Sequence, residues 1–227
     1  MYYNAQPPTF TDFEREHYKS ICDELSDNAR AIQPSAVEGN IWMDGDPAER
    51  EALVMAVAGA VDMAAPGQPF LYLEVGFNAG HSAAMMLSVF PHLQTRSFDI
   101  FGHEYARPKF ALLEERVGRG RASLTCGDSR VTLPSAGVGS ATLEGLADVV
   151  RIDGGHTLEV AAADLLNGRR LAKPRALVLL DDCTFAEVHE AWRVALDLGV
   201  VAPLREGLGW KGMCVGRYIP EAPAPSS

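Results

Sequence analysis

The stretch that decides the fold is residues 147–182, ADVVRIDGGHTLEVAAADLLNGRRLAKPRALVLLDD. It begins with an apolar run that ends at Ile152, turns through DGGH, continues as a helix-like stretch and closes on a second apolar run, ALVLL. Val, Leu and Ile dominate both runs, which is typical of parallel strands that are covered on both faces. The stretch therefore predicts a strand, a crossover helix and a second, parallel strand.

The same alternation extends outward from this unit. Toward the N-terminus, the apolar runs PFLYLEV, TRSFDI and ASLTCGD alternate from residue 69 onward with stretches that suit crossover helices. Toward the C-terminus, VVAPLRE and KGMCVGRYI are joined by a Gly-rich segment, which predicts an antiparallel hairpin at the end of the sheet. Together these elements predict a doubly wound α/β sheet.

We expect one domain with three parts. Residues 1–68 have a helical pattern, and Asp46 followed by Pro47 is a typical helix start. Residues 69–219 form the core, and residues 220–227 form a flexible tail. A chain of 227 residues is long enough to bury one sizeable core.

Composition excludes several classes of function. The formal net charge is -10 and the pI is about 5.0, which disfavours nucleic acid and anionic membrane surfaces as partners because both need clustered Lys and Arg. We find no export signal and no apolar stretch typical of a membrane span, so we expect a soluble cytoplasmic protein. The four cysteines lie far apart in the sequence, which indicates small buried hydrophobic residues rather than a zinc site or disulfides.

Each predicted parallel strand ends in an acid. These acids lie 25, 29, 25 and 28 residues apart, close to the length of one strand–helix unit. If the strands are parallel, the acids share the edge of the sheet where such folds bind ligands. A single acid at such a position also fits an ordinary helix cap, but five together favour a ligand or cation site. The five are Glu74, Asp99, Asp128, Asp153 and Asp181.

The loop after the first strand, LEVGFNAGHSA at residues 73–83, has features of a ligand loop. Gly76 and Gly80 allow tight turns and close approach of the backbone to a ligand. The loop lacks the G-x-G-x-x-G pattern of dinucleotide binders, and Glu74 disfavours a pyrophosphate. Asp99, at the end of the second strand, is well placed to bind two ribose hydroxyls.

At this point the chain resembles class I S-adenosylmethionine-dependent methyltransferases, from residue 69 to about 200. The E-x-G-x-x-x-G pattern is similar to the first motif of that family, and CGDSRVTLP is similar to the stretch that contacts adenine. The resemblance implies a Rossmann-like, mostly parallel seven-stranded sheet with N-terminal helices and the C-terminal antiparallel hairpin. It also implies S-adenosylmethionine as cofactor, bound by Glu74, Gly76, Asn78, Gly80, Asp99, Asp128, Ser129 and Asp153.

A narrower resemblance comes from DGGH together with LLDDC. Both are similar to the metal-dependent O-methyltransferases of macrolide sugars and related natural products. That resemblance implies a divalent metal, expected to be Mg²⁺, on Asp153, Asp181 and Asp182, with His156 as general base beside Asp153 in the catalytic set. Carboxylates are hard ligands that suit Mg²⁺. The alternative is that His156 and Asp182 only cap the helices that follow them.

The expected activity is methylation of a hydroxyl group on a small molecule, with a secondary metabolite as the expected substrate. Alternatives left open are N- or C-methylation, a non-methylating reaction, a non-catalytic cofactor-binding subunit and a nicotinamide oxidoreductase. The oligomeric state is open, with a homo-oligomer among the alternatives. Four residues near Gly-rich loops suit either an acceptor pocket or ordinary core or dimer contacts, namely Trp42, Met43, Trp210 and Met213.

Overall fold

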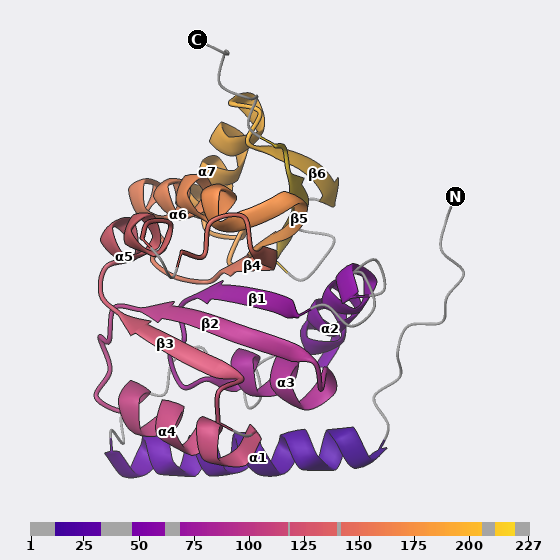
Figure 1. The fold of residues 1–227 in the computed structure, drawn as a ribbon, viewed down its shortest axis with the longest axis vertical. Coiled ribbons are helices and arrows are strands. Elements are labelled where there is room, and N and C mark those ends of the chain that lie inside the picture. Colours follow the sequence, from indigo (N-terminus) through magenta and orange to yellow (C-terminus); the bar gives the residue numbers. More distant parts are fainter. Residues whose placement is uncertain are drawn as a thin grey trace. The chain divides into compact units, whose positions relative to one another are not determined.

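The computed structural model describes residues 12–32, 47–61, 69–117, 119–139, 142–205 and 212–220. Within these residues the chain has seven helices and seven strands, in two compact units that meet in the sequence between Asp128 and Ser129 (Figure 1). The predicted division of the chain at residue 68 stays a prediction.

The first unit holds three parallel strands in the order β3-β2-β1. All six residues of β1 are buried, as expected for a parallel strand with both faces covered. Helices α3 and α4 follow β1 and β2 in the chain. The bounds are β1 Phe70–Val75, α3 His81–Val89, β2 Leu93–Asp99, α4 Ala106–Val117 and β3 Ala122–Cys126.

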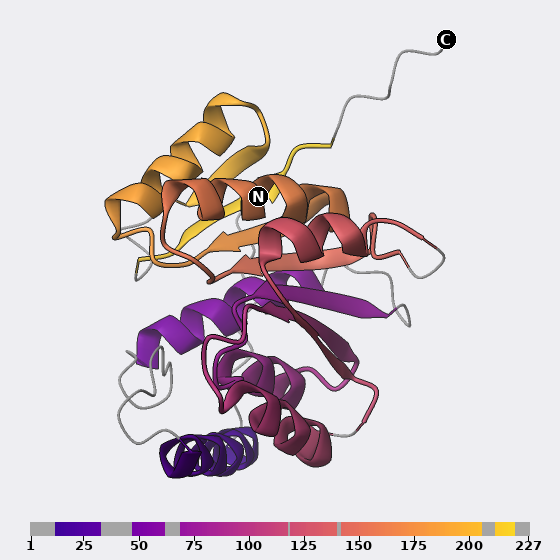
Figure 2. The ribbon, with the colours of Figure 1, turned by 90° about the vertical axis from the view of Figure 1, so that its left-hand side faces the viewer.

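Two helices precede these strands, α1 (Asp12–Ile32) and α2 (Pro47–Val61). Helix α1 packs against α3 and α4 and buries one apolar stripe that includes Ile21, Cys22 and Leu25 (Figures 1 and 2). The N-terminal helices are thus confirmed. The predicted helix cap Asp46, and the pocket candidates Trp42, Met43 and Trp210, lie outside the described residues.

The second unit holds β4 and β5 in parallel, and then β7 and β6, in the order β4-β5-β7-β6. Strand β7 is antiparallel to both of its neighbours, which confirms the predicted antiparallel pair at the C-terminal end. Helices α5, α6 and α7 lie side by side (Figure 2). The bounds are α5 Ser129–Ala136, β4 Ala147–Ile152, α6 Leu158–Leu171, β5 Ala172–Leu180, α7 Ala186–Asp197, β6 Val201–Arg205 and β7 Cys214–Tyr218.

The architecture confirms the predicted fold, an α/β Rossmann-like arrangement with mostly parallel strands. The acids lie where the alternation placed them. Asp99 is the last residue of β2, Asp153 directly follows β4, and Asp181 directly follows β5. Carboxyl ends of parallel strands are where such folds bind ligands.

The expectation of buried cysteines has a mixed outcome. Cys22, Cys183 and Cys214 are buried free thiols, as predicted. Cys126 is exposed, because it is the last residue of β3, which is an edge strand. No helix in the described ranges is long and apolar enough to cross a membrane. Met213 is fully buried, in keeping with a core role.

Candidate active site

The loop between β1 and α3 turns through left-handed backbone at three of the predicted cofactor residues. Gly76, Asn78 and Gly80 have φ values of 92°, 49° and 80°. A Cβ atom on Gly80 would lie 2.5 Å from the Phe77 ring, so this position needs glycine for space as well as for conformation. The loop closes on itself through a bond of 2.7 Å from the Gly80 N–H to the Phe77 carbonyl oxygen.

Asp99 holds this loop in place. Its Oδ2 atom accepts bonds from the backbone N–H groups of Phe77 and Asn78, both at 2.9 Å, and its Oδ1 atom accepts from Phe101 N–H at 2.6 Å. A carboxylate offers about four acceptor positions. Asp99 therefore retains capacity for a hydroxyl group, and its predicted role as ribose ligand stays a prediction. The sequence did not reveal its role in organising the loop.

Glu74 is fully buried, and both of its carboxylate oxygens accept hydrogen bonds. Ser82 Oγ donates to Oε2 at 2.6 Å, and Ser97 Oγ donates to Oε1 at 2.7 Å. Ser97 lies opposite Glu74 in the β1–β2 register, and Ser82 lies in the first turn of α3. The carboxylate thus ties β1, β2 and α3 together. Sequence reasoning missed both serines.

Two more residues support the loop from within the first unit. Tyr105 is fully buried and donates a bond of 2.6 Å to Asn78 Oδ1. His81, at the start of α3, lies 3.0 Å from Ser26 Oγ of α1, and burial lowers the pKa of His81 to about 4. His81 is therefore neutral at physiological pH and serves as a structural contact between helices.

Asp128 and Ser129 belong to the predicted adenine stretch. Asp128 lies between β3 and α5, and Ser129 is the first residue of α5. Both are half-buried, and each belongs to a different compact unit. Their predicted role stays a prediction.

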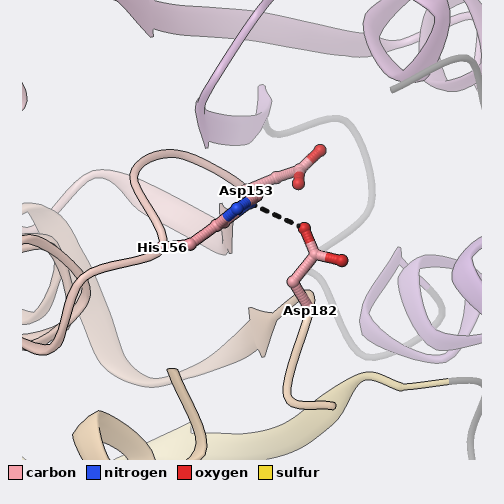
Figure 3. A group of neighbouring side chains, drawn as sticks. All are labelled: Asp153, His156 and Asp182. Atoms are coloured by element: carbon pink, nitrogen blue, oxygen red, sulfur yellow. Dashed lines mark ion pairs between the residues drawn. The ribbon is translucent and has the colours of Figure 1, made fainter. Parts of the chain in front are cut away.

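In the second unit, Asp153, His156 and Asp182 come together (Figure 3). Each offers one ligand atom, and these atoms all lie within 4.8 Å of one another. Asp153 and His156 come from the turn after β4, and Asp182 comes from the turn after β5. His156 Nε2 is 2.9 Å from Asp182 Oδ2, and its ring stacks on Phe185 at 4.9 Å between centroids.

The capping alternative does not account for these residues. Thr157, not His156, is the N-cap of α6, and it accepts a bond from the Val160 N–H. Phe185 is the N-cap of α7, with no side-chain cap bond. Asp182 instead has a left-handed φ of 57°, and its carboxylate lies beside the His156 imidazole.

Asp181 differs from the other predicted metal ligands. Its side chain is 9% exposed and pairs with Arg151, whose Nη2 atom is 2.5 Å from Asp181 Oδ2. The same nitrogen is 2.9 Å from Asp153 Oδ2. Burial and the charge of Asp181 raise the pKa of Asp182, and His156 and Arg151 act in the opposite direction. Sequence reasoning missed the role of Arg151, although an arginine inside an apolar strand was a visible signal.

Comparison with known proteins decides the family. Residues 73–183 match the family model described as a methyltransferase domain. The chain is therefore an S-adenosylmethionine-dependent methyltransferase, with its methyltransferase domain over these residues. No curated protein matches it significantly in sequence.

Solved structures similar to this methyltransferase support the same fold. The TDP-rhamnose 3'-O-methyltransferase of calicheamicin biosynthesis is 17% identical, with a TM-score of 0.61 over 91% of this chain and 95% of that one. A Podospora anserina methyltransferase with bound SAH is 13% identical, with a TM-score of 0.61 over 94% and 99%. The O-methyltransferase TomG of Streptomyces achromogenes, in complex with SAM, is 14% identical, with a TM-score of 0.59 over 86% and 89%.

The residues that the methyltransferase brings together fit a divalent cation. Two carboxylates and one imidazole converge, and the side chains of Asp153 and Asp182 are 31% and 37% exposed, so a cation and a substrate oxygen have access to them. Carboxylate oxygens are the ligands that Mg²⁺ and Mn²⁺ prefer.

Proposed function

We propose that this methyltransferase transfers a methyl group from S-adenosylmethionine to a hydroxyl group of a small molecule, assisted by a divalent cation. The observation that carries the proposal is the convergence of Asp153, His156 and Asp182 at the ends of two parallel strands. The similar structures from calicheamicin and tomaymycin biosynthesis support a secondary metabolite as the acceptor.

The first unit supplies the features that bind the cofactor. The loop with Gly76, Asn78 and Gly80 brings backbone close to a ligand, and Asp99 fixes that loop while keeping acceptor capacity for a ribose hydroxyl. We assign Glu74 to positioning, because its carboxylate is fully buried and bound by two serines.

We assign His156 as the general base. An alcohol must lose its proton before or during attack on the methyl group, and imidazole is the side chain that ionises near neutral pH. Asp182 lies beside one ring nitrogen of His156 and orients the ring, so the other nitrogen is left to take the proton. The acceptor oxygen then bonds to the methyl carbon as the carbon–sulfur bond breaks. The electron pair stays on sulfur, giving the methyl ether and S-adenosylhomocysteine.

Asp153 and Asp182 are the residues that would hold a divalent cation. When bound there, the cation would supply Lewis-acid polarisation that lowers the pKa of the acceptor hydroxyl. Asp181, the third predicted ligand, is already bound to Arg151.

A survey with methyl-¹³C S-adenosylmethionine tests the proposal. The protein is incubated with a panel of sugar, phenol and polyketide alcohols in Mg²⁺, and products are detected by mass and by the ¹³C shift of the new methyl group. The expected product carries a methoxy carbon. Transfer to amines or to carbon instead of oxygen would reject the proposal.

A further inference from the structure

The acidic cluster contains a buried cation of its own. Arg151 belongs to β4, and its side chain is only 4% exposed. Its Nη2 atom reaches two carboxylates from two neighbouring strand ends, Asp181 at 2.5 Å and Asp153 at 2.9 Å. A buried guanidinium is stable only when it is paired in this way.

The cluster therefore has an inner and an outer layer. In the inner layer, Asp181 uses both oxygens, since Oδ2 binds Arg151 and Oδ1 accepts the Asp182 backbone N–H at 2.9 Å. The outer layer is Asp153, His156 and Asp182, whose ligand atoms converge and whose side chains are about one-third to one-half exposed. Asp153 belongs to both layers, because it binds Arg151 and also faces the group that fits a cation.

We propose that Arg151 is a fixed counter-charge of the metal site, and that Asp181 anchors Arg151 instead of binding the metal. The inference rests on the proposed function, which supplies the metal. Three carboxylates carry three negative charges, and Arg151 cancels one of them. A divalent ion then neutralises the remaining two. Arg151 is thus a positioning residue: it holds Asp153 in place before a metal binds.

This role makes a prediction that a purely structural arginine does not share. Arg151→Met keeps much of the side-chain volume but leaves three carboxylates without a fixed cation. Breaking a buried ion pair is strongly destabilising, so in EDTA the melting temperature should fall by roughly 10 °C. Mn²⁺ should recover most of that loss, because the ion supplies the missing positive charge. Mn²⁺ affinity should rise about tenfold over the wild type.

Two matched variants separate a ligand from an anchor. Asp181→Asn and Asp182→Asn each remove one negative charge from the cluster. The loss of that charge alone should therefore weaken Mn²⁺ binding by a similar factor in both variants. If Asp182 is a ligand and Asp181 is not, Asp182→Asn should weaken Mn²⁺ at least tenfold more than Asp181→Asn. Equal losses would show that Asp181 binds the metal directly, and would overturn the proposal.

The experiment combines Mn²⁺ titration, followed by electron paramagnetic resonance, with thermal unfolding in EDTA and in Mn²⁺. Arg151→Lys should restore most of the wild-type behaviour. Arg193→Met is the control, because Arg193 forms an exposed pair with Glu190 on α7. A fall in melting temperature for Arg151→Met that Mn²⁺ does not recover would overturn the proposal.

The same data separate this inference from the proposed function. If the wild type binds no Mn²⁺, metal assistance fails; Mn²⁺ binding by Arg151→Met alone would then show that Arg151 supplies the positive charge of the cluster in place of a metal. If Arg151→Met does not fold even in Mn²⁺, the role is overturned, and the Asp181→Asn and Asp182→Asn pair still tests the ligand set.

Discussion

Replacing Asp99 with asparagine tests how the cofactor loop is held. The carboxylate accepts three backbone N–H bonds, at 2.9, 2.9 and 2.6 Å, on two oxygens that face different donors. An asparagine has one acceptor oxygen, so its NH₂ group must face either the pair from Phe77 and Asn78 or the Phe101 N–H. At least one bond is lost, and one backbone donor then faces another donor.

The magnitude follows from these bonds. A hydrogen bond to a charged group contributes about 1.5–3 kcal/mol, and Asp99 is half-buried, so we expect a loss of stability of about 2 kcal/mol. For a chain of this size that corresponds to a fall of roughly 4–8 °C in melting temperature. Cofactor affinity should fall by about 1–3 kcal/mol, or roughly 5–150-fold, because the loop is less ordered and a ribose acceptor is weakened.

Calorimetric titration with S-adenosylhomocysteine and denaturant unfolding measure the two effects separately. The control is Asp148→Asn, which makes the same chemical change at a carboxylate that pairs with Lys173 at 2.6 Å in the second unit. That control should bind the cofactor like the wild type. A folded Asp99→Asn protein that binds within twofold of the wild type would refute the reasoning.

Three further predictions concern single residues. His156→Gln should lower kcat by about 10²–10⁴-fold, the usual contribution of a general base, with cofactor affinity unchanged by calorimetry; a loss under threefold would exclude His156 as the base. The fold raises the pKa of Asp182, mainly through burial, so the folded state favours the protonated carboxyl group. The free energy of unfolding is therefore higher while Asp182 is protonated at low pH, and it falls as the pH rises through that pKa. In EDTA at pH 7, Asp182→Asn should therefore melt at a higher temperature than the wild type, and the gain should disappear in acid; no gain at pH 7 contradicts the assignment. Gly80→Ala should destabilise by about 1–3 kcal/mol in urea unfolding, because its φ is 80° and its Cβ would meet Phe77, whereas Gly59→Ala, in open space on α2, should be neutral or stabilising.

The sequence was sufficient to predict that these acids lie at the ends of strands. Each predicted strand is followed by a turn and a helix, so the spacing places Asp99, Asp153 and Asp181 at strand ends without any knowledge of packing. The positive φ values of Gly76 and Gly80 were predictable for a similar reason, since a strand that turns at once into a helix needs such residues.

The partners of these acids were not predictable, because they depend on tertiary structure. Ser97 reaches Glu74 only because the β1–β2 register places them opposite each other. Asp181 and Asp182 are adjacent in the sequence, yet one pairs with buried Arg151 and the other with His156. The left-handed φ of Asp182 takes the chain out of the strand pleat. The residues around Asp182 in the sequence do not indicate that turn.

The rate of methyl transfer to a hydroxyl acceptor, with and without metal, tests the central claim most directly. The protein is stripped with EDTA, supplied with labelled S-adenosylmethionine and the acceptor found in the survey, and assayed before and after Mg²⁺ is added back. The account predicts that transfer to oxygen falls at least a hundredfold in EDTA and returns with Mg²⁺. Transfer to oxygen at the full rate in excess chelator would contradict metal assistance at Asp153 and Asp182.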